Sequence, residues 1–528
     1  MDDTEIELKS TPAAGQWERI GIKHHHGINL PLFALHSKNS AGIGEFPDLI
    51  PLLSWCNSLD LDVVQLLPLN DTGEDTSPYG ALSAFALNPL HLGLSALPNV
   101  DSNPILKTML KEAQKLTYCQ RIPYHQLHVN RNIFLKAYFQ EHSESIIESE
   151  GYKKFAENNP WVKGYALFKS IRKECNWQSW ENWPEEIKNP SENSLKQLTE
   201  KYEVQVSYHQ VIQYLCFEQM KAVKAHADSL GIFLKGDLPI LINSESADVW
   251  LNRRFFNMEL SAGAPPDHYS DDGQNWGFPL YNWDEMGKDG FKWWKERLSV
   301  ASNFYHIYRL DHVVGFYRIW GIAKGEKSKN GWFIPQEEQL WIPQGEKILS
   351  AMLQESSMLP IGEDLGNIPN EVRQNLQDLG VCGTKVMRWE RNWEGDSKFI
   401  PLDAYPALSM TTVSTHDSAP LSLWWVQSPE ESQVYASAKG WEYVTPLASD
   451  QQFAILYDSH HTTSLFHINL LGEYLAFFRD MVWDILEDER INTPGIVSDD
   501  NWTYRFKPSL EQITGDAPLG DLISDLIA

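Results

Sequence analysis

Short apolar runs bounded by turn residues alternate along the chain with segments whose apolar residues recur every three or four positions. The short runs are typical of buried parallel strands, and the other segments are typical of amphipathic helices that cover a sheet. Helices are predicted at residues 46–59, 204–230, 291–304 and 369–379. The candidate strands are residues 28–35, 62–69, 232–240, 305–313, 359–364, 385–390, 409–416 and 491–496. Eight alternations predict an α/β fold, a (β/α)8 TIM barrel.

Two insertions interrupt this alternation. Residues 92–200 are rich in Lys, Glu and aromatic residues, and we predict an inserted, mainly helical subdomain between strands two and three. Residues 243–283 are dense in Pro, Gly, Asp and Trp, which is typical of a long loop, here a loop subdomain over the barrel mouth. Since no repeat or low-complexity linker divides the chain, residues 1–528 are predicted to form a single barrel domain.

Charge and cysteine content narrow the possible partners. The chain carries 71 acidic and 44 basic residues, a net charge of −27, which argues against binding to nucleic acid or to anionic membranes. No secretory leader and no bilayer-spanning apolar run are recognised. The five cysteines are odd in number and never form a CxxC pair, so neither a disulfide framework nor a zinc site is expected. These features predict a cytoplasmic protein.

Aromatic residues are abundant: 21 Trp, 20 Tyr and 22 Phe make up 12% of the chain. Their flat faces could stack on sugar rings, although large cores also use them. Trp177, Trp180 and Trp183 are one example, because they fit either a remote sugar platform or the core of the inserted subdomain.

Three carboxylates follow directly after candidate strands: Asp311, Glu363 and Asp417. A carboxylate at such a position is costly to desolvate unless it has partners, and the carboxyl ends of barrel strands form the active-site face. One such residue alone would be explained equally well as a cap of the following turn. Three together favour an active site. Paired carboxylates suit glycosidic bonds, since one protonates the leaving oxygen while the other attacks the anomeric carbon.

These segments, with others along the chain, are similar to the sequence blocks of a known family. The further matches are residues 77–79 (Ser-Pro-Tyr), 83–89, 236–240, 247–250, 263–267 and 273–281, and the similarity extends from about residue 27 to residue 505. The chain resembles the amylomaltases or disproportionating enzymes, which are the 4-alpha-glucanotransferases of glycoside hydrolase family 77 in the α-amylase clan. The blocks at 263–267 and 273–281 are the most family-specific of these matches.

The resemblance implies a role for each matched residue. Asp311 would be the nucleophile, Glu363 the acid/base and Asp417 the stabiliser of the transition state. Arg309 would keep Asp311 ionised by lowering its pKa. The remaining substrate-binding positions would be Ser77, Tyr79, Asp237, Trp276, His312, His416 and Asn501. Two alternatives stay open: Tyr79 could be a packed aromatic beside a turn, and the segment with Asn501 could brace the last strand.

The implied reaction is a retaining double displacement that moves α-1,4-glucan segments between maltodextrins, in glycogen and maltodextrin metabolism. Donors would be maltodextrin, amylose or glycogen chains, and acceptors would be glucose or maltodextrin. Three rival hypotheses are a retaining α-glucan hydrolase, a branching enzyme and a non-catalytic glucan-binding barrel. No cofactor is expected, because no nucleotide-binding glycine motif is present. The run 24–26 (His-His-His) resembles a metal-binding tract, but consecutive side chains diverge, so no metal is expected either.

Overall fold

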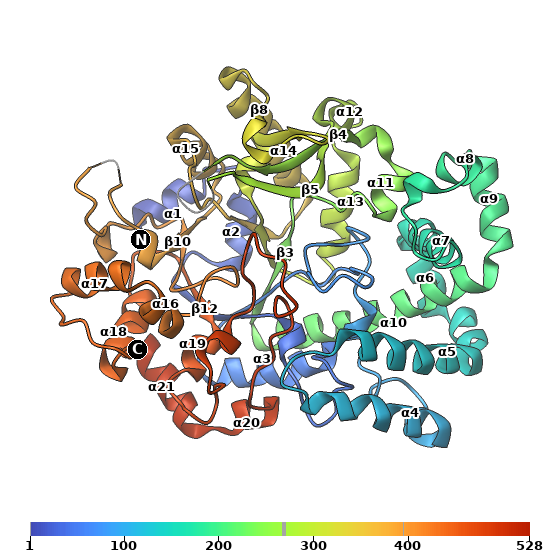
Figure 1. Ribbon diagram of the computed structural model, residues 1–528, viewed down its shortest axis with the longest axis horizontal. Coiled ribbons are helices and arrows are strands. Elements are labelled where there is room, and N and C mark those ends of the chain that lie inside the picture. The colour runs from blue at the N-terminus through green and yellow to red at the C-terminus, as the bar shows by residue number, and fades with distance from the viewer. Residues whose placement is uncertain (1, 267–270, 394) are drawn as a thin grey trace.

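The computed structural model describes residues 2–266, 271–393 and 395–528. Eight parallel strands form one sheet in the order β10-β11-β12-β1-β2-β3-β6-β9, and a parallel bridge between Ile361 and Cys382 joins β9 to the segment of β10. The sheet therefore closes into the expected (β/α)8 barrel (Figure 1). Its strands are β1 (His25–Leu30), β2 (Val63–Leu66), β3 (Phe233–Leu238), β6 (Ile307–Leu310), β9 (Leu359–Gly362), β10 (Gly383–Val386), β11 (Ser409–Thr412) and β12 (Phe466–Leu470).

The strands are buried because both faces of the sheet are covered. Every residue of β2, β6, β9, β11 and β12 is buried. This explains why the strands have continuous apolar runs rather than alternating patterns. Close strand contact also restricts residue choice: a Cβ on Gly27 of β1 would collide with the backbone of Val63 on β2.

Seven of the eight predicted strands are present, and the eighth prediction is wrong. Residues 491–496 form no strand; they include Pro494, whose backbone cannot donate to a sheet, and Gly495 in a left-handed conformation (φ 75°). The eighth strand is β12, whose sequence Phe-His-Ile-Asn-Leu places two polar side chains inside the fold. The sixth predicted strand is shifted, since β10 ends at Val386 and residues 387–389 form a 3-10 helix.

The four predicted helices are confirmed as α3 (Leu49–Ser58), α10 (Glu203–Leu230), α13 (Lys292–Ala301) and α15 (Asn370–Leu379). Both α10 and α15 end where the chain turns into the left-handed region, at Gly231 (φ 70°) and Gly380 (φ 78°). The other helices outside the long insertion are α1 (Asp2–Leu8), α2 (Ala14–Ile20), α11 (Ala247–Leu251), α12 (Trp283–Lys288), α14 (Trp341–Glu355), α16 (Leu421–Gln427), α17 (Pro429–Ala438), α18 (Ser449–His460), α19 (Leu471–Leu475), α20 (Leu510–Gly515) and α21 (Ala517–Ile527).

Between β2 and β3 the chain forms a group of helices on one side of the barrel, at the right in Figure 1. The long helix α10 packs against α5 and α7 of this group and against α3 of the barrel. Treating residues 92–200 as a separate subdomain remains a prediction. The helices of the group are α4 (Pro104–Gln114), α5 (Tyr124–Glu148), α6 (Glu150–Asn158), α7 (Trp161–Glu174), α8 (Glu185–Lys188) and α9 (Glu192–Lys201).

A second sheet lies at the upper edge of the molecule in Figure 1, where an irregular loop was expected. Its antiparallel order is β5-β4-β7-β8, with β4 (Phe256–Ala264), β5 (Gln274–Tyr281), β7 (Ile319–Ala323) and β8 (Trp332–Ile334). The expectation of a wholly irregular segment was therefore wrong for β4 and β5, whose register shifts and glycines hide the alternation of a strand. Residues 267–270 of the expected loop lie outside the described residues.

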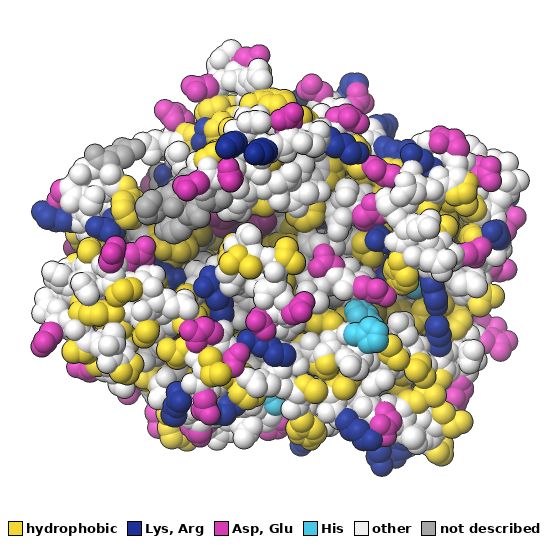
Figure 2. All heavy atoms as spheres, viewed as in Figure 1, with side chains coloured by type: hydrophobic (Ala, Val, Ile, Leu, Met, Phe, Trp, Pro, Cys, Tyr) yellow, Lys and Arg dark blue, Asp and Glu magenta, His cyan; other side chains and the backbone are white. Residues whose placement is uncertain are grey.

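Figure 2 shows acidic side chains scattered among basic ones over the face in view, which fits the net charge of −27. Within the described ranges, no helix is both long enough and apolar enough to cross a membrane.

Candidate active site

A cleft of about 1010 Å³ opens at the carboxyl ends of the barrel strands. Its lining includes all three predicted catalytic carboxylates, Asp311 after β6, Glu363 after β9 and Asp417 after β11. Parallel strands bring their carboxyl ends to the same edge, so residues far apart in the sequence meet here.

Arg309, near the end of β6, connects these acidic groups. Its Nη1 lies 2.7 Å from Asp311 Oδ1 and 3.0 Å from both carboxylate oxygens of Asp237, which is on β3. Its Nη2 lies 3.9 Å from Glu363 Oε2, within ion-pair range. Asp311 and Glu363 therefore flank one guanidinium group, which brings the two carboxyls together as glycoside chemistry requires.

The pKa of Asp311 differs from the expectation in its net direction. Burial raises the pKa of Asp311 and is the largest cause; Arg309 lowers it, and the carboxylate of Asp237 raises it again. The net direction is upward, so the prediction that Arg309 gives Asp311 a lowered pKa was wrong as a net result. The reason is that burial, together with the nearby carboxylate of Asp237, outweighs the lowering by Arg309.

Glu363 is held by backbone N–H groups. His312 N donates to Oε2 at 2.9 Å and Leu365 N donates to Oε1 at 3.0 Å. The first bond is possible because His312 adopts a left-handed conformation (φ 44°), which is uncommon for a residue with a side chain and often marks functional sites. Burial nevertheless dominates and raises the pKa of Glu363 to about 8, with Arg309 opposing and Asp311 adding to the rise. The carboxyl is therefore mostly protonated at neutral pH.

Asp417 has the opposite environment. Burial alone would raise its pKa, but His416 and Asn492, with Arg309, lower it to about 2. Asn492 Nδ2 donates to Asp417 Oδ1 at 2.6 Å, and His416 Nε2 lies 3.2 Å from Oδ2. The pKa values of Glu363 and Asp417 are thus shifted in opposite directions, so that one carboxyl is protonated and the other ionised. Such a pair is typical of a site in which one carboxyl acts as an acid and the other stabilises charge.

Tyr79 joins the two sides of the cleft. Its hydroxyl donates to Asp237 Oδ2 at 2.8 Å and lies 2.9 Å from His416 Nε2. Its ring stacks on the His416 imidazole, with centroids 5.5 Å apart and planes at 19°, and Trp502 lies 5.7 Å away on a tilted plane. Tyr79 thus lines the cleft and is part of its hydrogen-bond network.

One wall of the cleft comes from the β4–β5 hairpin. Gln274, Trp276 and Phe278 of β5 line it, and the Trp276 ring meets His312 edge-on with centroids 4.9 Å apart. Ser77 also lines the cleft, from the loop after β2.

Two predicted residues lie behind this surface. Asp237 is buried and reaches the cleft through Tyr79 and Arg309. Asn501 braces the loop after α19: its Oδ1 accepts from Thr493 N at 3.0 Å, and its Nδ2 donates to Ile496 O at 2.8 Å. Residues 493–496 form a loop, so Asn501 does not brace a last strand as the alternative stated, and sugar contact by Asn501 stays a prediction.

Several residues of the cleft were missed in the sequence. Asn492, the partner of Asp417, falls in the segment that was read as a strand, and Leu365 acts through its backbone, which no side-chain pattern reveals. Trp389 and Arg490 also line the cleft. Their proximity results from the barrel closure and has no signal in local sequence.

The run of histidines lies at the opposite, amino-terminal end of the strands. His24 Nδ1 is 3.1 Å from His467 Nε2, and His26 Nδ1 is 3.0 Å from His460 Nδ1. His25 turns elsewhere and bonds to Asp62. We call His24, His26, His460 and His467 the histidine cluster. Over the described part of the chain, no group of three or more His, Cys, Asp or Glu side chains is arranged to hold a metal ion.

Comparisons with known proteins match nearly the whole chain. The family model described as 4-alpha-glucanotransferase matches residues 30–511. A 4-alpha-glucanotransferase of Chlamydia pneumoniae is 47% identical over 507 residues, which cover 96% of this chain and 95% of the relative. One from Thermus thermophilus is 30% identical over 463 residues, covering 84% of this chain and 87% of the relative.

Among solved structures, the amylomaltase of Streptococcus agalactiae in complex with acarbose superposes with a TM-score of 0.80 at 24% identity, covering 96% of this chain and 98% of that one. The amylomaltase of Corynebacterium glutamicum gives a TM-score of 0.78 at 20% identity, covering 97% of this chain and 76% of that one. These two similarities concern the fold.

Proposed function

The chain belongs to the 4-alpha-glucanotransferase family, glycoside hydrolase family 77, and from that premise we propose that Asp311, Glu363 and Asp417 carry out its reaction. The activity is the transfer of α-1,4-glucan segments with retention of the α-linkage. The observation that carries the assignment is the guanidinium of Arg309, which is 2.7 Å from Asp311 and 3.9 Å from Glu363 in one cleft.

In the first step, protonated Glu363 gives its proton to the glycosidic oxygen while an oxygen of Asp311 attacks the anomeric carbon. The carbon–oxygen bond of the linkage breaks, the leaving chain departs with a free 4-hydroxyl, and a glucosyl ester forms on Asp311. The raised pKa of Glu363, about 8, keeps the required proton available at neutral pH.

In the second step, ionised Glu363 takes the proton of an acceptor 4-hydroxyl, whose oxygen attacks the anomeric carbon and releases Asp311. Two inversions restore the α-configuration. Asp417, with a pKa lowered to about 2, remains ionised and stabilises the positive charge that develops on the sugar in both transition states.

Transfer to a sugar requires that water be kept from the ester. The wall formed by Gln274, Trp276 and Phe278 supports this role for the β4–β5 hairpin, because it covers the cleft beside His312 with large side chains. We also propose that Tyr79 stacks on the sugar that is attacked, and that His312 and His416 bind its hydroxyls.

Donors in this proposal are maltodextrin, amylose or glycogen chains, and acceptors are glucose or maltodextrin. The acidic surface fits neutral sugar substrates in a cytoplasmic setting, within glycogen and maltodextrin metabolism.

The test is incubation of the pure protein with maltotriose, followed by separation of products by chain length and assay of reducing ends. We expect free glucose and a ladder of longer maltodextrins at constant reducing ends, and we expect Asp311→Asn to abolish both. A rise in reducing ends without longer chains would identify a hydrolase instead. Asp521→Asn, an exposed carboxylate on α21, is the matched control and should retain full activity.

A further inference from the structure

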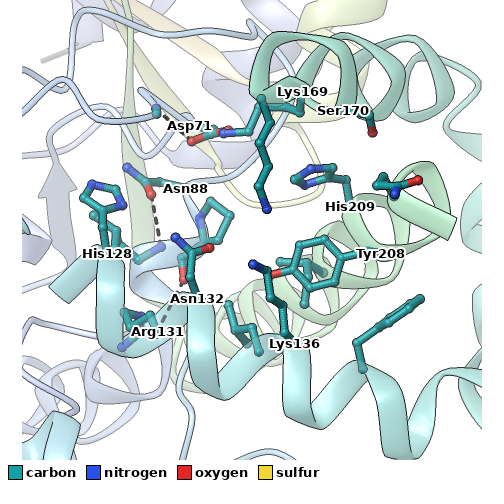
Figure 3. Close-up of a pocket in the computed structure, with 18 of the residues that line it drawn as sticks. Asp71, Asn88, His128, Arg131, Asn132, Lys136, Lys169, Ser170, Tyr208 and His209 are labelled. Carbon is teal, nitrogen blue, oxygen red and sulfur yellow. Dashed lines mark hydrogen bonds and ion pairs between the residues drawn. The ribbon is translucent and has the colours of Figure 1, made fainter. Parts of the chain in front are cut away.

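A second cavity of about 350 Å³ lies among the inserted helices, apart from the catalytic cleft. Residues of α5, α7 and α10 form most of its wall, together with the loop after β2 (Figure 3). Its size falls at the lower end of the roughly 300–1,000 Å³ that is typical of small-molecule sites. Asp71 and Glu74 of that loop line the cavity, and the same loop continues to Ser77 and Tyr79 in the cleft.

Two exposed lysines, Lys136 and Lys173, line this wall and have no counter-ion among the described residues. Lys136 of α5 and Lys173 of α7 lie so close that Lys136 lowers the pKa of Lys173, after burial as the larger cause. In the portion of the chain that the structure describes, no carboxylate forms an ion pair with either ammonium group. Lys169 differs, because its Nζ is paired with Asp71 Oδ2 at 2.7 Å. Four Lys or Arg side chains line the cavity against two carboxylates, Asp71 and Glu74, so it has a local excess of positive charge in a chain with net charge −27.

Further polar groups point toward the same space. Figure 3 shows Asn132, Lys136, Tyr208 and His209 directed into the cavity from α5 and α10. None of the side chains of Asn132, Tyr208 and His209 has a hydrogen bond to another described residue. Burial is the main cause that lowers the pKa of His209 to about 3, so its imidazole is neutral and offers one N–H donor.

Apolar and aromatic side chains form another part of the wall. Phe139 and Trp177 line the cavity beside Ile212, and the Trp177 side chain is exposed. Trp180 and Trp183 are buried and belong to the packed core. Aromatic faces next to polar groups suit a sugar ring, whose C–H face is apolar and whose hydroxyls are polar.

We propose that this cavity binds a small phosphorylated sugar, with its dianionic phosphate between Lys136 and Lys173 and its ring against the aromatic wall. A phosphomonoester presents three acceptor oxygens and close to two negative charges. These match two ammonium groups with the Tyr208 hydroxyl and the Asn132 amide as further donors. The ligand would neutralise the repulsion between the lysines, which a neutral sugar cannot do.

The proposal is tested by titration calorimetry of the full chain with glucose 1-phosphate, and separately with inorganic phosphate and with glucose. Lys136→Gln/Lys173→Gln removes the two cations, while Lys153→Gln/Lys154→Gln removes two exposed cations of α6 in the same helical group as a matched control. We expect glucose 1-phosphate to bind the wild type and the control equally, and to bind the Lys136/Lys173 variant at least about tenfold more weakly. Inorganic phosphate should bind at the same site more weakly, and glucose should not bind there.

Maltotriose transfer by the Lys136/Lys173 variant at the wild-type rate would establish that this variant is folded. The proposal is overturned if glucose 1-phosphate binds that variant as tightly as the wild type, since the ligand would then lie elsewhere, such as in the catalytic cleft. It is also overturned if glucose 1-phosphate does not bind the wild type, or if loss of the two lysines weakens the binding of glucose as much as that of glucose 1-phosphate. These outcomes do not depend on the roles proposed for Asp311 and Glu363.

Discussion

The acid role proposed for Glu363 predicts that the pH dependence of transfer changes with the leaving group of the donor. The carboxyl has a pKa of about 8 because it is buried, against 4.5 for an ordinary glutamate. This difference corresponds to about 5 kcal/mol in favour of the protonated form. At pH 7 most molecules would then hold the proton that the glycosidic oxygen needs. With the pKa of an ordinary glutamate, well under about 1% of the molecules would hold it.

The assay is the pH profile of kcat/KM for two donors, maltotriose and maltotriosyl fluoride. Transfer from maltotriose should fall about tenfold per pH unit above an apparent pKa near 8, as Glu363 loses its proton. Fluoride leaves without protonation, so the alkaline decline should disappear for the fluoride donor. Because Glu363 and Asp311 interact through Arg309, the observed pKa belongs to the pair.

Glu363→Gln provides the matched comparison. This variant should lose nearly all transfer from maltotriose but keep attack on the fluoride donor, since glutamine cannot donate a proton. The reasoning would be refuted by an identical alkaline decline for both donors, or by a decline for maltotriose that starts near pH 4.5.

Three further predictions concern other contacts. Asn492→Ala removes a 2.6 Å hydrogen bond to Asp417 and should raise the pKa of that carboxyl. We expect kcat to fall roughly tenfold to a hundredfold with a smaller change in KM. An unchanged kcat would contradict this prediction. Lys169→Met leaves Asp71 buried without its cation and should lower the free energy of unfolding by about 3–5 kcal/mol. Asp71→Asn/Lys169→Met should recover part of this loss. Equal denaturation midpoints for the wild type and both variants would exclude this prediction. His467, whose pKa burial lowers to about 3, binds a proton in the unfolded chain below pH 6.5 but not in the folded one. Stability should therefore fall by about 2 kcal/mol from this group between pH 7 and pH 5, and His467→Asn should reduce that pH dependence in denaturation experiments.

The barrel could be predicted because its buried strands have continuous apolar runs. The meeting of Asp311, Glu363 and Asp417 in one cleft could be predicted because each follows such a run directly. The eighth strand could not be found in this way. Residues 491–496 begin and end with isoleucine and imitate a strand, whereas β12 (Phe466–Leu470) contains His467 and Asn469, which are buried through hydrogen bonds rather than by being apolar. The pattern of apolar residues does not reveal polar side chains that are buried with all their hydrogen bonds made.

The site illustrates a second limit. The pKa of Asp311 depends on how Arg309 is shared with Asp237, and the position of Asn492 depends on a loop that returns to the cleft from the end of the barrel. The cavity beside Lys136 combines segments from four parts of the chain. Distances of this kind come from tertiary packing, and local sequence patterns do not contain them.

The central claim is that Asp311 becomes covalently glycosylated during transfer. The most direct measurement is mass spectrometry of Glu363→Gln after mixing with maltotriosyl fluoride, since the fluoride allows the first step and the missing base slows the second. The account predicts an intact mass increased by one maltotriosyl group, located by peptide mapping on Asp311 and absent in Asp311→Asn/Glu363→Gln. A stable glycosyl group on another residue, or fluoride release by Glu363→Gln at the wild-type turnover rate with no accumulated adduct, would contradict the account.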